Sequence, residues 1–398
     1  MMAYTYYEND PRVIRAAEAA RDGHFQVDVI ALRRVGQPPV ETIRGIRVFR
    51  IQSRYRGSSL LRYSLEYGGF FVRCAMLSMR LVRTMRYRLV HVHNMPDALV
   101  FAAWLPKLCG AKVLLDIHDP MPETYESKFH RFTSRVLHKA LLLQEHLSVA
   151  FADKTITVSD PVRDGILLKR GYRPERIDVI ANFADGELFK PITYPHLDGI
   201  IRFVFHGTIL ERYGLRTLLE AISQVSQRER IRVRIIGEGD FSPALRKLIT
   251  NYGLSESIEF LNRAYPLHDI PQMLSDCHVG LVPLDIGTST VANFALPLKL
   301  VEYTCLGLPS ISVRNAAIDY YFSSDECLFF TSGNAAELAA RIEEVADNPA
   351  RLMTIRNKLE LVRGRLLWSK EKAKYIELLQ NLTPRGGHQN SVGDYTHV

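Results

Sequence analysis

The sequence predicts an α/β protein with two doubly wound parallel sheets. Short apolar strands alternate with helical segments through the first half of the chain, and the same alternation begins again at Arg202–His206. The 398 residues are too many for one ordinary hydrophobic core, which favours two domains. We place an N-terminal domain at residues 1–185 and a C-terminal domain at residues 186–365, with Pro191 and Pro195 near the junction.

In the first half, short apolar stretches alternate with amphipathic ones. The expected strands are Met2–Tyr6, Gln26–Leu32, Ile46–Arg50, Leu89–His93, Lys112–Asp116, Lys154–Val158 and Ile177–Ile180. The expected helices are Pro11–Asp22, the basic region that precedes Leu89, and segments near 97–108, 132–151 and 160–170. The first of these helices follows Asn9 and Asp10, residue types that cap helix N-termini.

The second half repeats this arrangement. Its expected strands are Arg202–His206, Ile231–Ile236, Ile258–Leu261, Gly280–Pro283, Ser310–Val313 and Cys327–Phe330. Helices lie between these strands and continue to about Gly364. A last amphipathic helix is expected at residues 366–382, and the polar residues 383–398 that follow it are expected to be disordered.

The most informative helix runs from Pro297 to Gly307. Proline suits the first position of a helix, and glycine suits the position just past its end. The two charged residues of this helix, Lys299 and Glu302, lie on neighbouring faces of one turn. They form either a surface ion pair or a functional pair, in which Glu302 accepts hydrogen bonds from a diol and Lys299 faces a phosphate.

The net charge of +8 is spread unevenly. Residues 54–88 contain eight arginines, no lysine and a single acid, Glu66, with apolar and aromatic residues between them. This pattern fits either a solvated helix face or a basic amphipathic segment that lies on an anionic membrane. No recognised nucleic-acid-binding motif accompanies the charge, so no nucleic-acid partner is expected.

We expect the chain to work in the cytoplasm, at the inner face of a membrane. Its five cysteines are scattered, as in proteins of reducing compartments. No apolar run reaches the roughly 20 residues that a membrane-spanning helix needs. The N-terminus also lacks the pattern of a signal peptide.

Two glycine-containing turns follow strands of the second half. Gly207 and Thr208 open the first turn, with Arg212 close behind, and Gly237 and Gly239 form the second. Backbone N–H groups at the start of a helix suit a pyrophosphate, whose charge Arg212 can neutralise. Ligands of open parallel sheets bind beyond the carboxyl ends of the strands, which is where both turns are expected.

Three histidines lie at strand ends of the first half. His91 and His93 fall on the same side of one strand, and His118 directly follows the next strand. No third ligand is spaced as a metal site requires, so we expect no metal. The histidines are predicted to act as proton or hydrogen-bond partners.

Four segments of the chain resemble the family 4 glycosyltransferases: HVHNMPDALV, LLDIHDPMPETYESKF, FVFHGTILERYGL and ALPLKLVEYTCLGLPSI. The resemblance extends over nearly the whole chain and is greatest to the branch found in bacterial surface-polysaccharide gene clusters. It implies the GT-B fold, in which two Rossmann-like domains face each other and a C-terminal helix, here 366–382, packs back on the first domain.

The resemblance also implies an enzyme that transfers a sugar from a nucleotide-sugar donor to a saccharide acceptor, with retention of anomeric configuration. The basic segment at residues 54–88 suggests that this acceptor is linked to a lipid. No cofactor is expected, and the chain lacks the Asp-x-Asp motif with which metal-dependent sugar transferases hold manganese.

The resemblance implies roles for individual residues. Glu302 binds the donor ribose, Arg212 and Lys299 neutralise the diphosphate, and His118 faces the donor sugar. The implied catalytic residues are His118, Arg212, Lys299 and Glu302. The implied donor-binding residues are Gly207, Thr208, Gly237, Gly239, Leu298 and Leu300. The implied acceptor-side residues are His93, Asp97 and Asp119.

Some positions depart from the pattern of the family. Thr208 and Tyr213 stand where an arginine and a lysine are usual, and Phe294 stands where the first glutamate of an E-x7-E motif is usual. These departures keep open a non-catalytic scaffold of a polysaccharide assembly complex. A nucleotide-sugar epimerase on the same fold is a further alternative, although the LPLKLVEY helix favours transfer. By comparison with the family, the natural start is expected a few residues before Met1.

Overall fold

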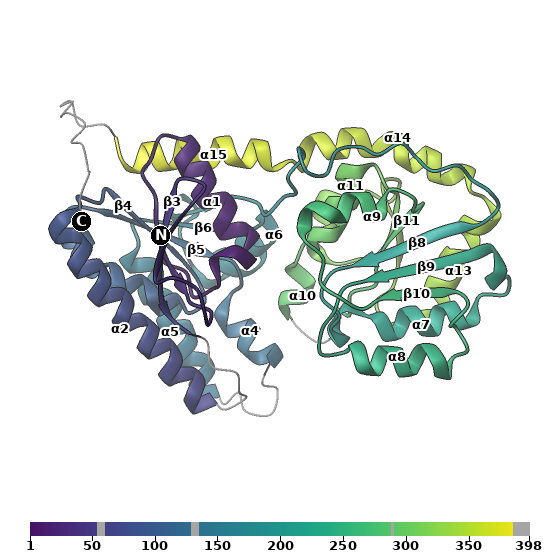
Figure 1. Cartoon of the computed structure of the whole chain (residues 1–398), viewed down its shortest axis with the longest axis horizontal. Coiled ribbons are helices and arrows are strands. Elements are labelled where there is room, and N and C mark those ends of the chain that lie inside the picture. The colour runs from purple at the N-terminus through teal and green to yellow at the C-terminus, as the bar shows by residue number, and fades with distance from the viewer. Residues whose placement is uncertain (54–59, 129–134, 288–289, 385–398) are drawn as a thin grey trace. The chain divides into compact units, whose positions relative to one another are not determined.

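The computed structural model describes residues 1–53, 60–128, 135–287 and 290–384 (Figure 1). The chain forms two compact units. The first unit consists of Met1–His118, Leu142–Ile156 and Lys372–Val398. The second unit consists of Asp119–Leu141 and Thr157–Glu371. Each unit is made of separate segments of the chain, so the units do not test a single boundary in the sequence. The domain boundary placed at residue 185 stays a prediction.

The strands of the first half form two sheets. They are β1 (Asp28–Leu32), β2 (Val40–Ile43), β3 (Ile46–Gln52), β4 (Leu89–His93), β5 (Lys112–Ile117), β6 (Lys154–Thr157) and β7 (Ile177–Val179). The strand orders are β1-β3-β2 and β4-β5-β6-β7. Met2 pairs in parallel with Ile30 of β1 and with Val92 of β4, which places the start of the chain between these strands. The strand predicted at Met2–Tyr6 is therefore reduced to a bridge at Met2.

The sequence analysis missed the edge strand β2. It pairs with β3 in an antiparallel hairpin, whose turn residues Arg44 and Gly45 have φ values of 51° and 78°. Two-residue hairpin turns of type I′ need this left-handed conformation at both positions and usually contain Asn-Gly or Asp-Gly. An arginine in the first position hides the signal, and the exposed residues of β2 show no apolar alternation.

The helices of the first half follow the predicted order. They are α1 (Pro11–Asp22), α2 (Leu60–Thr84), α3 (Trp104–Leu108), α4 (Met121–Lys128), α5 (Arg135–Phe151) and α6 (Asp160–Val162). The helix expected at 97–108 begins as the 3₁₀ segment Asp97–Ala103, and α6 continues into the π-helical turn Arg163–Leu167. Among the described residues, no helix has both the length and the apolar character needed to cross a bilayer.

The strands of the second half form one parallel sheet. They are β8 (Ile201–His206), β9 (Ile231–Ile236), β10 (Ile258–Leu261), β11 (Val279–Val282), β12 (Ser310–Val313) and β13 (Leu328–Phe330). Their order is β10-β9-β8-β11-β12-β13. This is the doubly wound order, in which the direction of strand addition reverses between β8 and β11. The predicted strands and the α/β class are confirmed.

Helices cover this sheet and complete its core. They are α7 (Leu215–Gln224), α8 (Ser242–Asn251), α9 (Ile270–Leu274), α10 (Thr290–Phe294), α11 (Leu298–Leu306), α12 (Ala316–Tyr321), α13 (Ala335–Asp347) and α14 (Ala350–Arg365). The bounds of α11 agree with the prediction: Pro297 is its N-cap and Gly307, with φ 70°, is its C-cap. The buried side of α11 contributes Leu300 and Leu306 to the core of the second unit.

The last helix, α15 (Trp368–Leu382), contacts each unit with a different part. In the second unit, the Trp368 N–H donates to the Ala184 carbonyl oxygen over 3.0 Å. In the first unit, the Tyr375 hydroxyl lies 2.8 Å from Nδ1 of His91. Thr383, the first residue of the predicted disordered tail, is buried and donates its N–H to Leu379, and residues 385–398 lie outside the described residues.

Candidate functional site

The two glycine turns of the second unit pack directly against each other. A Cβ atom on Gly237 would lie 1.9 Å from the Gly207 carbonyl oxygen, and one on Gly239 would lie 2.3 Å from the Ile209 carbonyl oxygen. Gly207 and Gly237 also have φ values of 120° and 135°, which side chains rarely adopt. The glycines are thus required by the close approach of the turns that follow β8 and β9.

The backbone of the first turn has only part of its hydrogen-bonding capacity left for a ligand. The N–H of Gly207 donates to the Ile236 carbonyl oxygen over 3.0 Å, so this group is already used. Thr208 is exposed, and in the described part of the chain its N–H has no hydrogen-bond partner. Of the two predicted backbone donors, Thr208 is the one that can reach an anion in this conformation.

Lys299 places its ammonium group beside the same turn. Its Nζ lies 3.9 Å from the centre of the Phe205 ring and 4.5 Å from that of Tyr213. A Cβ atom on Gly207 would lie 3.7 Å from this Nζ. Burial lowers the pKa of Lys299 to about 7, although the charge of Glu302 acts in the opposite direction. A bound anion would restore the charged form.

Glu302 contacts His206 and makes no ion pair with Lys299 among the described residues. Its carboxylate is buried, and Oε2 lies 3.2 Å from Nε2 of His206. Lys299 and Glu302 are not an ion pair in the described structure, so the alternative of a surface pair between them is wrong. His206 was missed by the sequence analysis. Its only signal is its place as the last residue of β8, directly before Gly207.

The remaining donor-side residues occupy different surroundings. Arg212 is exposed in the 3₁₀ turn Glu211–Tyr213, where its guanidinium lies 5.4 Å from the centre of the Tyr213 ring. Leu298 is half-buried, whereas Leu300 is buried in the core and has no surface for a ligand in this conformation. Phe294 packs its ring on Gly165, where a Cβ atom would come within 2.1 Å of it.

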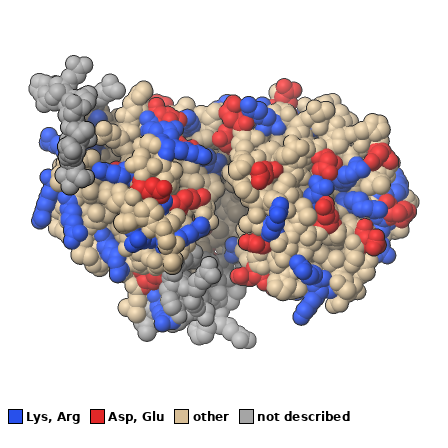
Figure 2. All heavy atoms as spheres, viewed as in Figure 1, with Lys and Arg blue, Asp and Glu red and all other residues tan. Residues whose placement is uncertain are grey.

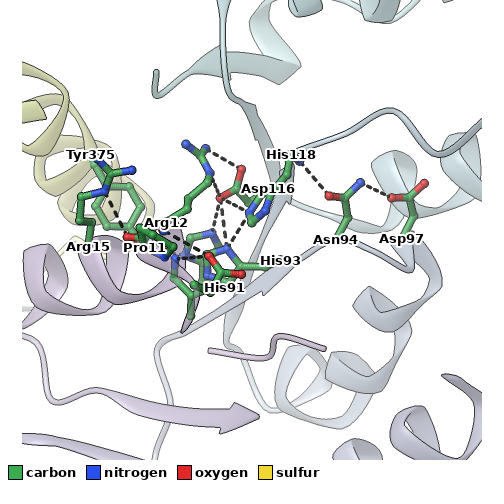
Figure 3. Close-up of polar contacts among 12 residues, drawn as sticks. Pro11, Arg12, Arg15, His91, His93, Asn94, Asp97, Asp116, His118 and Tyr375 are labelled. Atoms are coloured by element: carbon green, nitrogen blue, oxygen red, sulfur yellow. Dashed lines mark hydrogen bonds and ion pairs between the residues drawn. The ribbon is translucent and has the colours of Figure 1, made fainter. Parts of the chain in front are cut away.

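In the first unit, polar side chains converge on Asp116 at the end of β5 (Figure 3). Arg12 donates to both carboxylate oxygens, over 2.7 and 2.8 Å. His118 Nε2 and His93 Nδ1 lie 3.1 and 3.2 Å from Oδ2. Burial by itself would raise the pKa of Asp116, but Arg12 and the neighbouring histidines hold it well below its usual range.

Two histidines of this cluster, His91 and His93, are buried. Desolvation lowers the pKa of both imidazoles, so both are neutral. Nδ1 of His91 contacts the Tyr375 hydroxyl, and Nδ1 of His93 lies 3.0 Å from Nε2 of His118. The structure therefore brings together two predicted site residues, His93 and His118, and adds Arg12, Asp116 and Tyr375, which sequence spacing did not indicate.

Asp97, a predicted acceptor-side residue, supports the backbone behind His118. It is fully buried and accepts a hydrogen bond of 2.9 Å from the Asn94 amide. The Asn94 amide oxygen in turn accepts from the His118 N–H over 2.8 Å. His93 and Asp97 therefore lie beneath the surface in this conformation, while Asp119 is partly exposed next to His118 in the sequence.

His91, His93 and Asp116 are close enough to one another to hold a metal ion. The spacing argument against a metal relied on the lack of a third ligand, and Asp116 is such a residue. However, both oxygens of Asp116 are bonded to Arg12, whose positive charge neutralises the carboxylate that a cation would need. The cluster therefore fits a hydrogen-bonded ion pair better than a metal centre.

Two family models match the chain. The model described as Glycosyl transferase 4-like domain matches residues 12–182, and the model described as Glycosyl transferases group 1 matches residues 201–348. These ranges contain the histidine cluster and the paired glycine turns, respectively.

Curated relatives resemble part of the chain. A Salmonella typhimurium protein named as the colanic acid biosynthesis glycosyltransferase WcaL is 29% identical over 191 residues, which are 46% of this chain and 46% of WcaL. The lipopolysaccharide core biosynthesis glycosyltransferase LpsE of Rhizobium meliloti is 25% identical over 220 residues, 52% of this chain and 59% of LpsE. The chain spans about half the length of the curated relatives it matches.

Solved structures with the same fold match almost the entire chain. Sucrose-phosphate synthase from Thermosynechococcus elongatus has a TM-score of 0.74 at 18% identity, covering 96% of this chain and 98% of its own. HepE of Anabaena, solved with UDP and glucose, has a TM-score of 0.70 at 16% identity over 96% of this chain and 98% of its own. These neighbours are GT-B proteins, so the predicted GT-B fold is confirmed.

Proposed function

We propose that this chain, which belongs to the family 4-like glycosyltransferases, transfers a sugar from a nucleoside diphosphate donor to a hydroxyl group of a saccharide acceptor in surface-polysaccharide synthesis. The matches of both halves to glycosyltransferase models support this proposal. So do the relatives named for colanic acid and lipopolysaccharide core synthesis. A structural neighbour binds UDP and glucose, so UDP-sugars are the first donors to test.

The observation that carries the proposal is the position of the Lys299 ammonium group, which α11 places beside the Gly207 turn that follows β8. Its ammonium group rests on two aromatic rings, and no ion pair of Lys299 is found among the described residues. The exposed turn at Gly207 and Thr208 adds an N–H group. This is the switch point of the sheet, where doubly wound folds bind nucleotides. Together these groups suit the diphosphate of a donor.

The proposed reaction proceeds by front-face substitution with retention of configuration. Lys299, Arg212 and the Thr208 N–H stabilise the negative charge that develops on the leaving diphosphate, which is usually the largest contribution to such catalysis. These cations take the part that a metal ion has in metal-dependent transferases, so we propose a reaction without metal. The leaving phosphate accepts the proton of the acceptor hydroxyl, Glu302 holds the donor ribose, and His118 orients the donor sugar.

Calorimetric titration with UDP, GDP, ADP and dTDP in the presence of EDTA tests this assignment. We expect one nucleotide to bind tightly to the wild type and at least tenfold more weakly to Glu302→Ala, because a buried carboxylate contributes about 1.5–3 kcal/mol to a hydrogen bond. Binding of none of the four nucleotides would contradict the proposal and favour the scaffold alternative. Binding that requires an added divalent ion would contradict metal independence.

We further propose that the acceptor is lipid-linked and that the protein lies at the cytoplasmic face of an anionic membrane. Helix α2 supports this, because its exposed face combines Arg73, Arg80 and Arg83 with exposed Leu65 and Val72. Basic side chains recur over this part of the surface in Figure 2. A face that is both basic and apolar suits the boundary between lipid headgroups and acyl chains.

Two further helices of the first unit expose large apolar side chains. Trp104 and Leu108 are 43% and 75% exposed on α3, which packs against α2. Leu143 and Leu147, one turn apart on α5, are 60% and 52% exposed. Single exposed apolar residues are ordinary, but repeats at helical spacing indicate a face that contacts a partner.

Co-sedimentation with vesicles tests the membrane proposal. We expect binding to vesicles that contain anionic phospholipid, little binding to neutral ones, and a loss of at least tenfold in affinity for Arg73→Gln/Arg80→Gln/Arg83→Gln. We expect a loss of this size because each basic residue near an anionic surface contributes about 1 kcal/mol to the free energy of membrane binding. Equal binding to neutral and anionic vesicles would contradict the proposal. Arg246→Gln/Lys247→Gln, which removes two exposed charges from α8 of the second unit, is the control and should bind as the wild type does.

A further inference from the structure

The Asp116 carboxylate is the acceptor on which the histidine cluster converges. It is fully buried, and its pairing with Arg12 keeps it ionised. An ionised carboxylate can only accept hydrogen bonds. Every nitrogen that contacts it must therefore present a proton, as both guanidinium nitrogens of Arg12 do.

This requirement assigns the tautomer of His118. Its Nε2 lies 3.1 Å from Oδ2 of Asp116 and therefore carries the proton. In the neutral form of the ring this is the single N–H, so Nδ1 of that form has a free lone pair. The side chain of His118 is 20% exposed, and its ring contacts with Asp116 and His93 both involve Nε2. The lone pair of Nδ1 is thus the group left for a ligand.

The contacts of His91 agree with this orientation. Nε2 of His91 faces Asp116 at 3.7 Å, which leaves Nδ1 of His91 to accept a hydrogen bond from the Tyr375 hydroxyl over 2.8 Å. The backbone of His118 is fixed separately, because its N–H donates to Asn94. Figure 3 shows Arg12 of α1, His91 and His93 of β4, and His118 directed toward Asp116. Hydrogen bonds therefore fix His118 at two points, its backbone N–H and Nε2 of its ring.

We propose that Asp116, kept ionised by Arg12, is a positioning residue that makes Nδ1 of His118 a hydrogen-bond acceptor for a substrate hydroxyl. The ligand expected at Nδ1 of His118 is therefore a hydroxyl group that donates a hydrogen bond. The lone pair of Nδ1 would repel an anionic group. The proposal rests on the proposed function for the identity of that ligand, a hydroxylated sugar. The proposal goes beyond the proposed function because it names the atom that binds the hydroxyl and the residues that set the protonation of that atom.

Nitrogen-15 spectroscopy of protein labelled at histidine tests the tautomer without measuring activity. Long-range proton–nitrogen correlations distinguish a protonated ring nitrogen from a bare one, and His118→Gln identifies the His118 signals. We expect a bare Nδ1 and a protonated Nε2 in the full-length wild type. A protonated Nδ1 with a bare Nε2 would overturn the proposal, whatever reaction the protein performs.

The Asp116→Asn substitution tests the requirement that Nε2 of His118 carries the proton. The amide has an N–H₂ group in place of one carboxylate oxygen. When this group takes the place of Oδ2, Nε2 of His118 has to accept a hydrogen bond, and the proton moves to Nδ1. Because this variant leaves the guanidinium without its anion, Arg12→Gln/Asp116→Asn is the second variant, with no unpaired buried charge. In the double variant no ionised acceptor remains, so Nε2 of His118 is no longer required to carry the proton. We expect both variants to shift the His118 tautomer toward a protonated Nδ1 and to lower kcat by about 100-fold, while the nucleotide Kd stays unchanged.

Tyr375→Phe is the matched control, since it removes a hydroxyl from the far side of the cluster. We expect it to change the signals of His91 and to leave the His118 tautomer as it is. An unchanged His118 tautomer in the Arg12→Gln/Asp116→Asn variant would overturn the proposal. If no donor supports transfer, the proposed function fails, and the spectra still decide the tautomer.

Discussion

The ammonium group of Lys299 lies 4.5 Å from the centre of the Tyr213 ring. The same ring carries the guanidinium of Arg212 at 5.4 Å, so one aromatic side chain gathers two cations. Tyr213 occupies the position where the family usually has a lysine. A cation is attracted to the face of an aromatic ring by about 0.5–2 kcal/mol. The departure from the family pattern therefore keeps positive charge beside the glycine turn instead of removing it.

Lys299 should make nucleotide binding depend on pH. Its pKa of about 7 in the free protein means that the amine becomes neutral as the pH rises above 7. A diphosphate binds the charged form, so binding takes up a proton above this pH. We expect the Kd to rise by up to tenfold per pH unit between about pH 7.5 and 9. Titration calorimetry in buffers of different ionisation enthalpy measures both the Kd and the proton uptake.

Lys299→Arg and Lys299→Met are the controls for this dependence. Arginine stays protonated throughout the range, so its variant should bind with a Kd that changes little with pH. The methionine variant should bind more weakly at pH 7 and should also lose the dependence. A wild-type Kd that is constant from pH 7 to 9 would show that Lys299 is not the group that meets the diphosphate.

Glu302 should recognise the ribose hydroxyls of the donor. Its carboxylate is buried beside His206, where a diol could donate hydrogen bonds to it. We expect the wild type to bind a nucleoside diphosphate at least tenfold more tightly than its 2′,3′-dideoxy analogue, since a hydrogen bond to a charged group contributes about 1.5–3 kcal/mol. Competition binding compares the two ligands. Glu302→Ala should bind them equally, and continued discrimination in that variant would assign the ribose contact to another residue.

Gly237 should not tolerate a side chain. Its φ of 135° is unfavourable for alanine, and the added Cβ atom would lie 1.9 Å from the Gly207 carbonyl oxygen. We expect Gly237→Ala to lower the free energy of unfolding by about 3 kcal/mol or more and to weaken nucleotide binding, because the turn before Thr208 must move. Gly253→Ala is matched to it, with a φ of 64° and no atom within 4 Å. Gly253→Ala should lower the free energy of unfolding by only about 1 kcal/mol and leave nucleotide binding intact. Chemical denaturation measures both.

The sequence predicted those features that depend on local chemistry. Pro297 and Gly307 set the ends of α11 as expected, and every strand of the second half was found within a residue or two of its place. The glycines after β8 and β9 were correctly placed beyond strand ends. Their packing against each other, however, depends on the distance between two turns that lie far apart in the sequence.

Contacts over long sequence separations could not be predicted in this way. Arg12 and Asp116 are 104 residues apart, and His91 and Tyr375 are 284 apart. No spacing rule connects such pairs, because their proximity follows from the order of the strands and from the course of α15. The predicted site residues follow from the family resemblance, whereas the residues that hold them in place became visible only with the fold.

The contact between Gly165 and Phe294 yields a prediction about packing. A Cβ atom on Gly165 would lie 2.1 Å from Cε1 of Phe294, so Gly165→Ala should lower the free energy of unfolding by about 1–3 kcal/mol. Phe294→Leu removes the obstructing ring atoms. In that background Gly165→Ala should be neutral or stabilising, because alanine favours the helical turn Arg163–Leu167 by up to about 1 kcal/mol. Gly364→Ala, which meets no atom within 4 Å in α14, should be stabilising in both backgrounds. Thermal unfolding of the four variants of this cycle gives the coupling between residues 165 and 294, and additive effects would mean that Phe294 does not occupy this position in solution.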